Sequence, residues 1–154
     1  MILPLKVWLQ SDDSLCGPAS IKMIADWYNL DYTEAQLAKL CNHSYEKGCT
    51  NEDIVRTLTQ IGFNPKLVRE SSIEQIEEEI KKGKPVIIDW FIGDPANGHS
   101  SVVIGYDDAN LIILDPLKVE PVVVDKTDFL ICWFDYTEVP ITRDNLELRV
   151  MITL

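Results

Sequence analysis

Basic residues are scarce in this 154-residue sequence. There are 14 Lys and Arg residues against 25 Asp and Glu residues, which gives a net charge of -11. Proteins that bind nucleic acid use basic groups to release counterions from phosphates, and anionic membrane surfaces attract basic segments. The densest basic group is only Lys81, Lys82 and Lys84. The composition therefore argues against nucleic acid and membrane surfaces as partners, whereas a cationic peptide would meet no repulsion.

Long apolar runs are also missing. A membrane-spanning helix needs about 20 consecutive apolar residues, and the apolar stretches of this sequence are far shorter. The first ten residues, MILPLKVWLQ, are apolar but lack the basic start and the small-residue cleavage site of a signal peptide. We therefore expect no stable membrane insertion and a cytoplasmic location.

Cysteine and histidine are few. The four cysteines are Cys16, Cys41, Cys49 and Cys132, and we expect them to be reduced because the chain is large enough to fold without crosslinks. Cys41, His43 and Cys49 could suggest a metal site, but no second close pair with zinc-ligand spacing accompanies them. We expect no metal or other cofactor, and we expect His43 to have no role beyond its polar loop.

The sequence contains no internal repeat, low-complexity tract or Pro/Gly-rich linker. With 46% hydrophobic residues, a chain of this length can bury one proper core, so we expect a single domain over residues 1–154. Helical patterns fill the first half and strand patterns fill most of the second. That segregation predicts an α+β fold with N-terminal helices packed on a C-terminal antiparallel sheet.

Four helices are predicted in the first half. The first begins at Gly17-Pro18, because proline is favoured in the first turn, and ends near Asn29. The second starts near Thr33, with Gln36 completing a capping box. The third and fourth are expected at residues 51–60, before Gly62, and from Ser71-Ser72 to Gly83.

From Pro85 the hydrophobic pattern becomes that of strands. Strands are predicted at residues 86–92 (VIIDWFI), from His99 (HSSVVIGYD), at 111–114, at 122–124 and in the tail 143–154. A loop is expected over Gly93–Gly98, and residues 128–134 fit either a short helix or an edge segment. Short turns between these strands favour antiparallel pairing.

Cys16 is the candidate nucleophile, because it lies at the start of a predicted helix. The N–H groups and dipole of a helix N-terminus favour negative charge, and they can lower a thiol pKa from ~8.5 into the range of about 3.5–7.5. Gln10 precedes it by six residues, and its amide could join the Cys16 backbone N–H as an oxyanion hole. Taken singly, Cys16 fits better as a small buried side chain at a helix start, and Gln10 fits better as an ordinary surface glutamine.

His99 and Asp115 are the candidate base and its orienting partner. His99 opens one predicted strand and Asp115 closes the next, so an imidazole and a carboxylate could meet at one sheet edge. The alternatives are a solvent-facing strand-end histidine and an ordinary Asp-Pro turn. Asp107 and Asp108 compete for the orienting role, but they lie in a turn that points away from the start of the His99 strand.

Together these segments resemble a known family. Gln10 followed by SDDSLCGPAS, then GHSSVVIGYDD and LIILDP, is similar to the papain-like cysteine peptidases of the bacteriocin-processing, double-glycine-leader type and to their stand-alone relatives. The resemblance covers roughly residues 7–134. It implies a papain-like fold in which Gln10 is the oxyanion residue, Cys16 the nucleophile, His99 the base and Asp115 the orienter.

The resemblance also implies an activity. A triad of this kind would hydrolyse a peptide or amide bond through an acyl-enzyme. Leader-processing members are usually fused to a membrane exporter and its ATPase, so a transporter or another protein is a candidate partner, although these 154 residues contain neither segment. Two alternatives stay open: an acyltransferase that uses the same triad, and a non-catalytic peptide-binding module of the same fold. The presence of all four site residues argues against the binding module.

Overall fold

The computed structural model describes residues 1–92 and 98–154. Apart from Gly98, the predicted loop over Gly93–Gly98 lies outside the described residues. The five helices of the described part are α1 (Cys16–Trp27), α2 (Glu34–Leu40), α3 (Asn51–Gln60), α4 (Ile73–Lys81) and α5 (Lys126–Cys132). The strands found there are β1 (Lys66–Val68), β2 (Val86–Trp90), β3 (His99–Tyr106), β4 (Asn110–Leu114), β5 (Val122–Asp125), β6 (Phe134–Tyr136), β7 (Leu146–Leu148) and β8 (Val150–Thr153).

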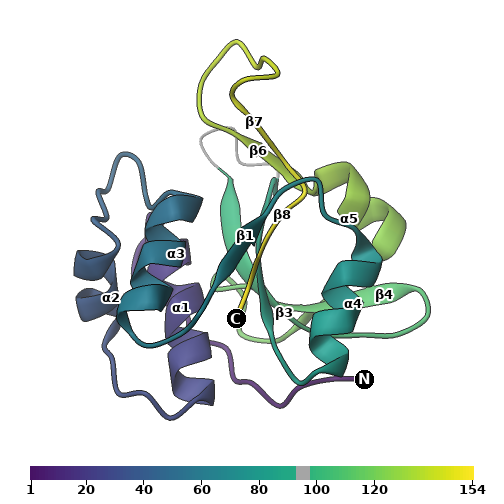
Figure 1. Cartoon of the computed structure of the whole chain (residues 1–154), viewed down its shortest axis with the longest axis horizontal. Helices are drawn as coiled ribbons and strands as arrows, with labels where there is room; N and C mark the ends of the chain where they lie inside the picture. Colours follow the sequence, from purple (N-terminus) through teal and green to yellow (C-terminus); the bar gives the residue numbers. More distant parts are fainter. Residues whose placement is uncertain (93–97) are drawn as a thin grey trace.

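A six-stranded sheet forms the middle of the molecule. Its strand order is β1-β8-β2-β3-β4-β5, and every neighbouring pair is antiparallel. Helices α1, α2 and α3 lie on one side of the sheet, and α4 and α5 lie on the other (Figure 1). The predicted α+β fold, with N-terminal helices on an antiparallel sheet, is confirmed. The second helical layer gives the sheet two buried faces and the molecule two hydrophobic clusters.

Three of the helices begin as the sequence signals dictate. Thr33, Thr50 and Ser72 are the N-caps of α2, α3 and α4, and each forms a capping box with the residue three positions on. Each box satisfies two backbone N–H groups that the first turn leaves without partners. Helix α1 differs, because its N-cap is Leu15, which has no side-chain acceptor. The N-cap side chain therefore accepts no hydrogen bond from the backbone N–H groups at the start of α1.

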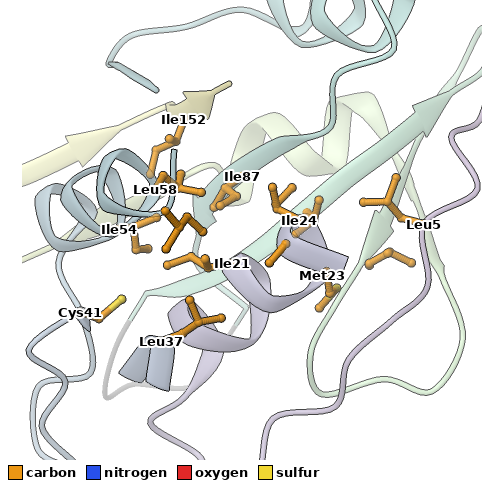
Figure 2. Packing of buried hydrophobic residues seen from close by; sticks show 14 of the residues in the cluster. Leu5, Ile21, Met23, Ile24, Leu37, Cys41, Ile54, Leu58, Ile87 and Ile152 are labelled. Atoms are coloured by element: carbon orange, nitrogen blue, oxygen red, sulfur yellow. The ribbon is translucent and has the colours of Figure 1, made fainter. Parts of the chain in front are cut away.

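The larger cluster fixes α1 against the sheet. Ile21 and Ile24 of α1 are fully buried, as are Ile54 and Leu58 of α3, and these side chains converge on Ile87 of β2 (Figure 2). Each such side chain contributes roughly 1.5–3 kcal/mol when it is removed from water. This packing holds the N-terminus of α1 in a fixed place relative to β2 and its neighbour β3.

The C-terminal part differs from the sequence prediction in detail. Residues 128–134 are mostly helix, within α5, and β6 follows directly. The tail 143–154 holds two strands instead of one, because Arg149 adopts a positive φ of 47° and separates them. β7 pairs with β6 in a small second sheet, whereas β8 enters the main sheet between β1 and β2. β1 was not predicted, because a strand of three residues carries almost no periodic signal.

Candidate active site

Cys16 is the first residue of α1 and is partly exposed. Its thiol forms a side-chain hydrogen bond with His99, which opens β3. The helix N-terminus therefore brings the sulfur to the end of the sheet where β3 starts. Backbone N–H groups at this helix end favour negative charge on the thiol or on a bound oxygen.

Asp115 lies on the other side of His99. Its Oδ1 is 2.7 Å from His99 Nε2, and both residues are almost fully buried. β3 and β4 are paired so that Val102 faces Leu114, and this register brings the start of one strand to the end of the other. The backbone N–H of Leu117 also donates to Asp115 Oδ1 at 2.9 Å, which fixes the carboxylate. Since Nε2 faces Asp115, Nδ1 is the ring nitrogen left for Cys16.

The electrostatics of this chain favour a charged imidazole. Burial on its own would lower the pKa of His99, but the hydrogen bonds to Asp115 and Cys16 outweigh it and raise the pKa to about 9. Burial likewise opposes the charge on Asp115, but the His99 and Leu117 hydrogen bonds keep its pKa below the usual value. At neutral pH the site therefore holds the Asp115 carboxylate and the His99 imidazolium beside the Cys16 sulfur.

Gln10 lies beside the same sheet edge. Its backbone N–H donates to the Pro116 carbonyl at 3.0 Å, which ties it to the residue that follows Asp115. Its Nε2 donates to the Asp12 carbonyl at 2.7 Å, and its Oε1 is buried without a hydrogen-bond partner in the described part of the chain. An amide nitrogen carries two hydrogens, so one of them remains available for an oxyanion.

The rejected candidates have other partners. Asp107 Oδ1 accepts hydrogen bonds from the backbone N–H groups of Ala109 and Asn110 in the β3–β4 turn, so it does not orient His99. His43 Nε2 contacts Ser14 Oγ at 2.6 Å, so its loop is attached to the segment just before Cys16. No group of His, Cys, Asp or Glu within residues 1–92 and 98–154 could hold a metal ion.

Sequence reasoning missed a second polar group next to the site. Asp89 of β2 is buried, and its Oδ2 accepts a hydrogen bond from Asn51 Nδ2 at 2.7 Å. Asp135 of β6 forms a side-chain hydrogen bond with Asp89 and accepts one from the backbone N–H of Gly98. The signal for Asp89 was present in the sequence, because an acidic residue interrupts the otherwise apolar strand VIIDWFI. Nothing in the sequence marked Asp135.

The antiparallel sheet, the helix that begins at a cysteine and the neighbouring histidine and aspartate define the class: this is a papain-like cysteine peptidase fold. A sequence profile of the Peptidase_C39 like family matches residues 2–140. The chain belongs to that family.

Solved structures agree with this fold. The peptidase domain of Streptococcus ComA, a bifunctional ABC transporter of a quorum-sensing pathway, is 23% identical, with a TM-score of 0.73 and 96% of each chain covered. A double-glycine-motif protease from an AMS/PCAT transporter, solved in complex with the leader peptide, is 20% identical, with a TM-score of 0.71 and 99% of this chain and 93% of that chain covered. A C39-like peptidase from Bacillus anthracis is 17% identical, with a TM-score of 0.72 and coverages of 99% and 96%. No curated protein matches the sequence.

In the part of the chain that the structure describes, no helix is both long enough and apolar enough to cross a membrane.

Proposed function

We propose that the protein is a cysteine peptidase or amidase whose nucleophile is Cys16. The observation that carries the proposal is the hydrogen-bonded chain from the Cys16 thiol through His99 to Asp115, placed at a helix N-terminus. Burial of His99 and Asp115 keeps water from weakening these contacts. The catalytic unit is a single domain over residues 1–154.

The mechanism is acyl transfer. The proton of the Cys16 thiol passes to His99, and the resulting thiolate attacks the substrate carbonyl carbon and forms a C–S bond. The Cys16 backbone N–H and the free hydrogen of Gln10 Nε2 stabilise the oxyanion. His99 gives its proton to the leaving amine as the C–N bond breaks. Asp115 keeps the imidazole in the orientation and tautomer that this step needs. Water then attacks the thioester, His99 accepts its proton, and the C–S bond breaks to release the acid.

The substrate class that fits is a peptide or amide without net negative charge. The net charge of -11 repels acidic chains and attracts cationic ones. One similar structure holds a leader peptide, and two of the similar proteins are peptidase parts of transporters. This supports a peptide substrate for this chain and a transporter or another protein as its partner.

A cytoplasmic location is part of the proposal. All four cysteines are free thiols, and unpaired thiols are typical of proteins in a reducing compartment. Cell fractionation coupled to thiol labelling tests this directly. Recovery of the protein from an oxidising compartment, with its cysteines crosslinked, would contradict it.

The experiment that tests the chemistry is capture of the acyl-enzyme. The protein is mixed with a small activated ester or a peptide thioester, quenched in acid, and analysed by mass spectrometry after digestion. We expect an acyl group on Cys16 that is absent in Cys16→Ala. Cys132→Ala is the matched control, because it also removes a partly exposed cysteine, and in this variant the acyl group on Cys16 should remain. Equal acylation of all partly exposed cysteines would contradict the proposal.

The same experiment separates the acyltransferase alternative. If added amines or thiols remove the acyl group much faster than water at equal occupancy of Cys16, the protein is a transferase that uses the same groups. If no acyl-enzyme forms with any donor, the binding-module alternative gains support.

A further inference from the structure

Two carboxyl groups next to the site have no part in the chemistry described above. Asp89 of β2 is 6% exposed and is held by Asn51 of α3. Asp135 of β6 is half-buried and is hydrogen-bonded to the Asp89 side chain. They come from separate elements of the chain and meet beside Gly98, the residue that directly precedes His99.

A hydrogen bond between two carboxyl groups requires a proton on one of them. Asp135 accepts backbone N–H groups from Gly98 and from Tyr136, the latter at 2.7 Å, and both contacts favour its charged form. Asp89 is the more deeply buried of the two. Burial and the adjacent Asp135 together raise the pKa of Asp89 to about 8. Burial raises the pKa of Asp135 too, but its two backbone donors oppose that rise. We therefore assign the proton to the more deeply buried Asp89 and the negative charge to Asp135.

The contact between Asp135 and Gly98 leaves no room for a side chain at position 98 unless the Asp135 carboxylate moves away. A Cβ placed on Gly98 would lie 2.1 Å from the carboxyl carbon of Asp135, far inside van der Waals contact. The carboxylate thus lies directly against this backbone and accepts its N–H. Because Gly98 is bonded to His99, the contact fixes the direction in which the chain enters β3.

We propose that Asp135, hydrogen-bonded to Asp89, is a positioning residue that holds the Gly98 backbone and so keeps the His99 ring aligned between Cys16 and Asp115. The effect of Asp135 on catalysis, through the alignment of His99, rests on the proposed function. The contact with Gly98 is a property of the fold and can be tested without it.

The groups of residues 1–92 and 98–154 that face the pair bear on its charge. Asn51 of α3 donates to Asp89, and His99 of β3 favours the Asp89 anion by its positive charge. Glu147 of β7 opposes ionisation of both carboxyl groups. Glu147 itself pairs with Arg69, the residue that follows β1, at 2.8 Å, which moderates that repulsion. When Asp89 loses its proton above about pH 8, two carboxylates would be in contact, and their repulsion would loosen the bond to Gly98.

Three substitutions test the proposal. Asp135→Ala removes the acceptor for Gly98. Asp135→Asn keeps an acceptor oxygen for Gly98 and an N–H for Asp89. Asp89→Asn imitates the protonated form and leaves the Asp135 carboxylate in place. Asp107→Ala is the matched control, because it also removes a carboxylate that accepts backbone N–H groups, but in the exposed turn between β3 and β4.

The first readout is the rate at which Cys16 is alkylated near pH 7. We expect Asp135→Ala to slow it about tenfold or more, since small misplacements of a catalytic group are costly. Asp135→Asn and Asp89→Asn should keep most of the wild-type rate, and Asp107→Ala should keep all of it.

The second readout is the amide NMR shift of Gly98 against pH. The wild type should show a step near pH 8 before the step of His99 near 9, and Asp89→Asn should lose only the first.

The outcomes separate cleanly. A wild-type rate in Asp135→Ala, or equal slowing in Asp135→Ala and Asp135→Asn, would overturn the positioning role. If Asp135→Ala does not fold, the Asn variants still test the proposal. A step in the Gly98 shift near pH 8 that survives in Asp89→Asn would show that Asp89 is not the titrating group, and this would also overturn the proposed pair. If Cys16 in the wild type shows no reactivity that depends on His99, the proposed function fails, while the Gly98 shift still reports on the contact.

Discussion

At the scale of single residues, the site depends on how His99 balances burial against its partners. A buried imidazole with no partner would be neutral at pH 7, yet contacts with Asp115 and Cys16 raise the pKa of His99 to about 9. Because this value lies above the unfolded value of 6.5, the charged ring stabilises the fold fully below about pH 6.5. That contribution is lost as the pH rises through 9. Removing either partner should therefore lower the pKa.

Asp115→Ala provides the direct check. We expect the pKa of His99 to fall, because burial is then opposed by Cys16 alone, and we expect alkylation of Cys16 near pH 7 to slow about tenfold or more. The imidazole proton shifts in NMR measure this, since the chain has only two histidines. His43, which contacts Ser14, is the internal reference. An unchanged His99 titration would contradict the account of the triad.

At the scale of elements, capping boxes start α2, α3 and α4, while packing against the sheet holds α1. Helix α3 carries Asn51 in its first turn, directly after the cap Thr50. The capping of α3 therefore also supports the contact between Asn51 and Asp89.

Thr50→Ala should lower the free energy of unfolding by about 1 kcal/mol, the usual loss for a removed N-cap. Thr59→Ala is the matched control, because Thr59 lies on the exposed side near the end of the same helix and its hydroxyl donates to the Val55 carbonyl. Urea denaturation monitored by circular dichroism measures both. An equal loss of unfolding free energy in the two variants would contradict the stabilising role of Thr50 as the N-cap.

These elements also show what the sequence could predict. Caps and hydrophobic periodicity predicted the helices, and β-branched runs predicted β2 to β5, because both signals are local. The break at Arg149 and the short strands β1 and β6 depend on pairing between distant segments, so local patterns could not indicate them. Cys16, His99 and Asp115 were proposed as site residues from their order and a family resemblance. Asp135 was not, because its role arises only where β6 meets Gly98.

At the scale of the whole molecule, the excess of acidic residues dominates. A net charge of -11 makes the folded state repel itself, and it does so more strongly than the expanded unfolded chain. Among the described cations, Lys22, Arg56 and Lys82 pair with acidic residues three or four positions away. Arg69 and Lys126 pair with acidic residues of other elements. Exposed pairs of this kind contribute little to stability.

Salt should therefore stabilise the fold. Raising sodium chloride from about 0.01 M to 0.15 M shortens the screening length from roughly 30 Å to 8 Å, so the urea midpoint should rise. Glu138→Lys, at an exposed position, should raise the midpoint at low salt and reduce its salt dependence. A midpoint that falls with salt would contradict this view of the surface charge.

The central claim is that Cys16 is an activated thiol paired with His99, and the rate of Cys16 alkylation against pH tests it most directly. The rate is followed by mass spectrometry in the wild type and in His99→Ala, with Cys41, Cys49 and Cys132 as internal references. We predict that near pH 6 Cys16 reacts far faster than the other three cysteines, and that His99→Ala removes this advantage. A Cys16 that titrates like a free thiol near ~8.5 and does not respond to the substitution would contradict the account.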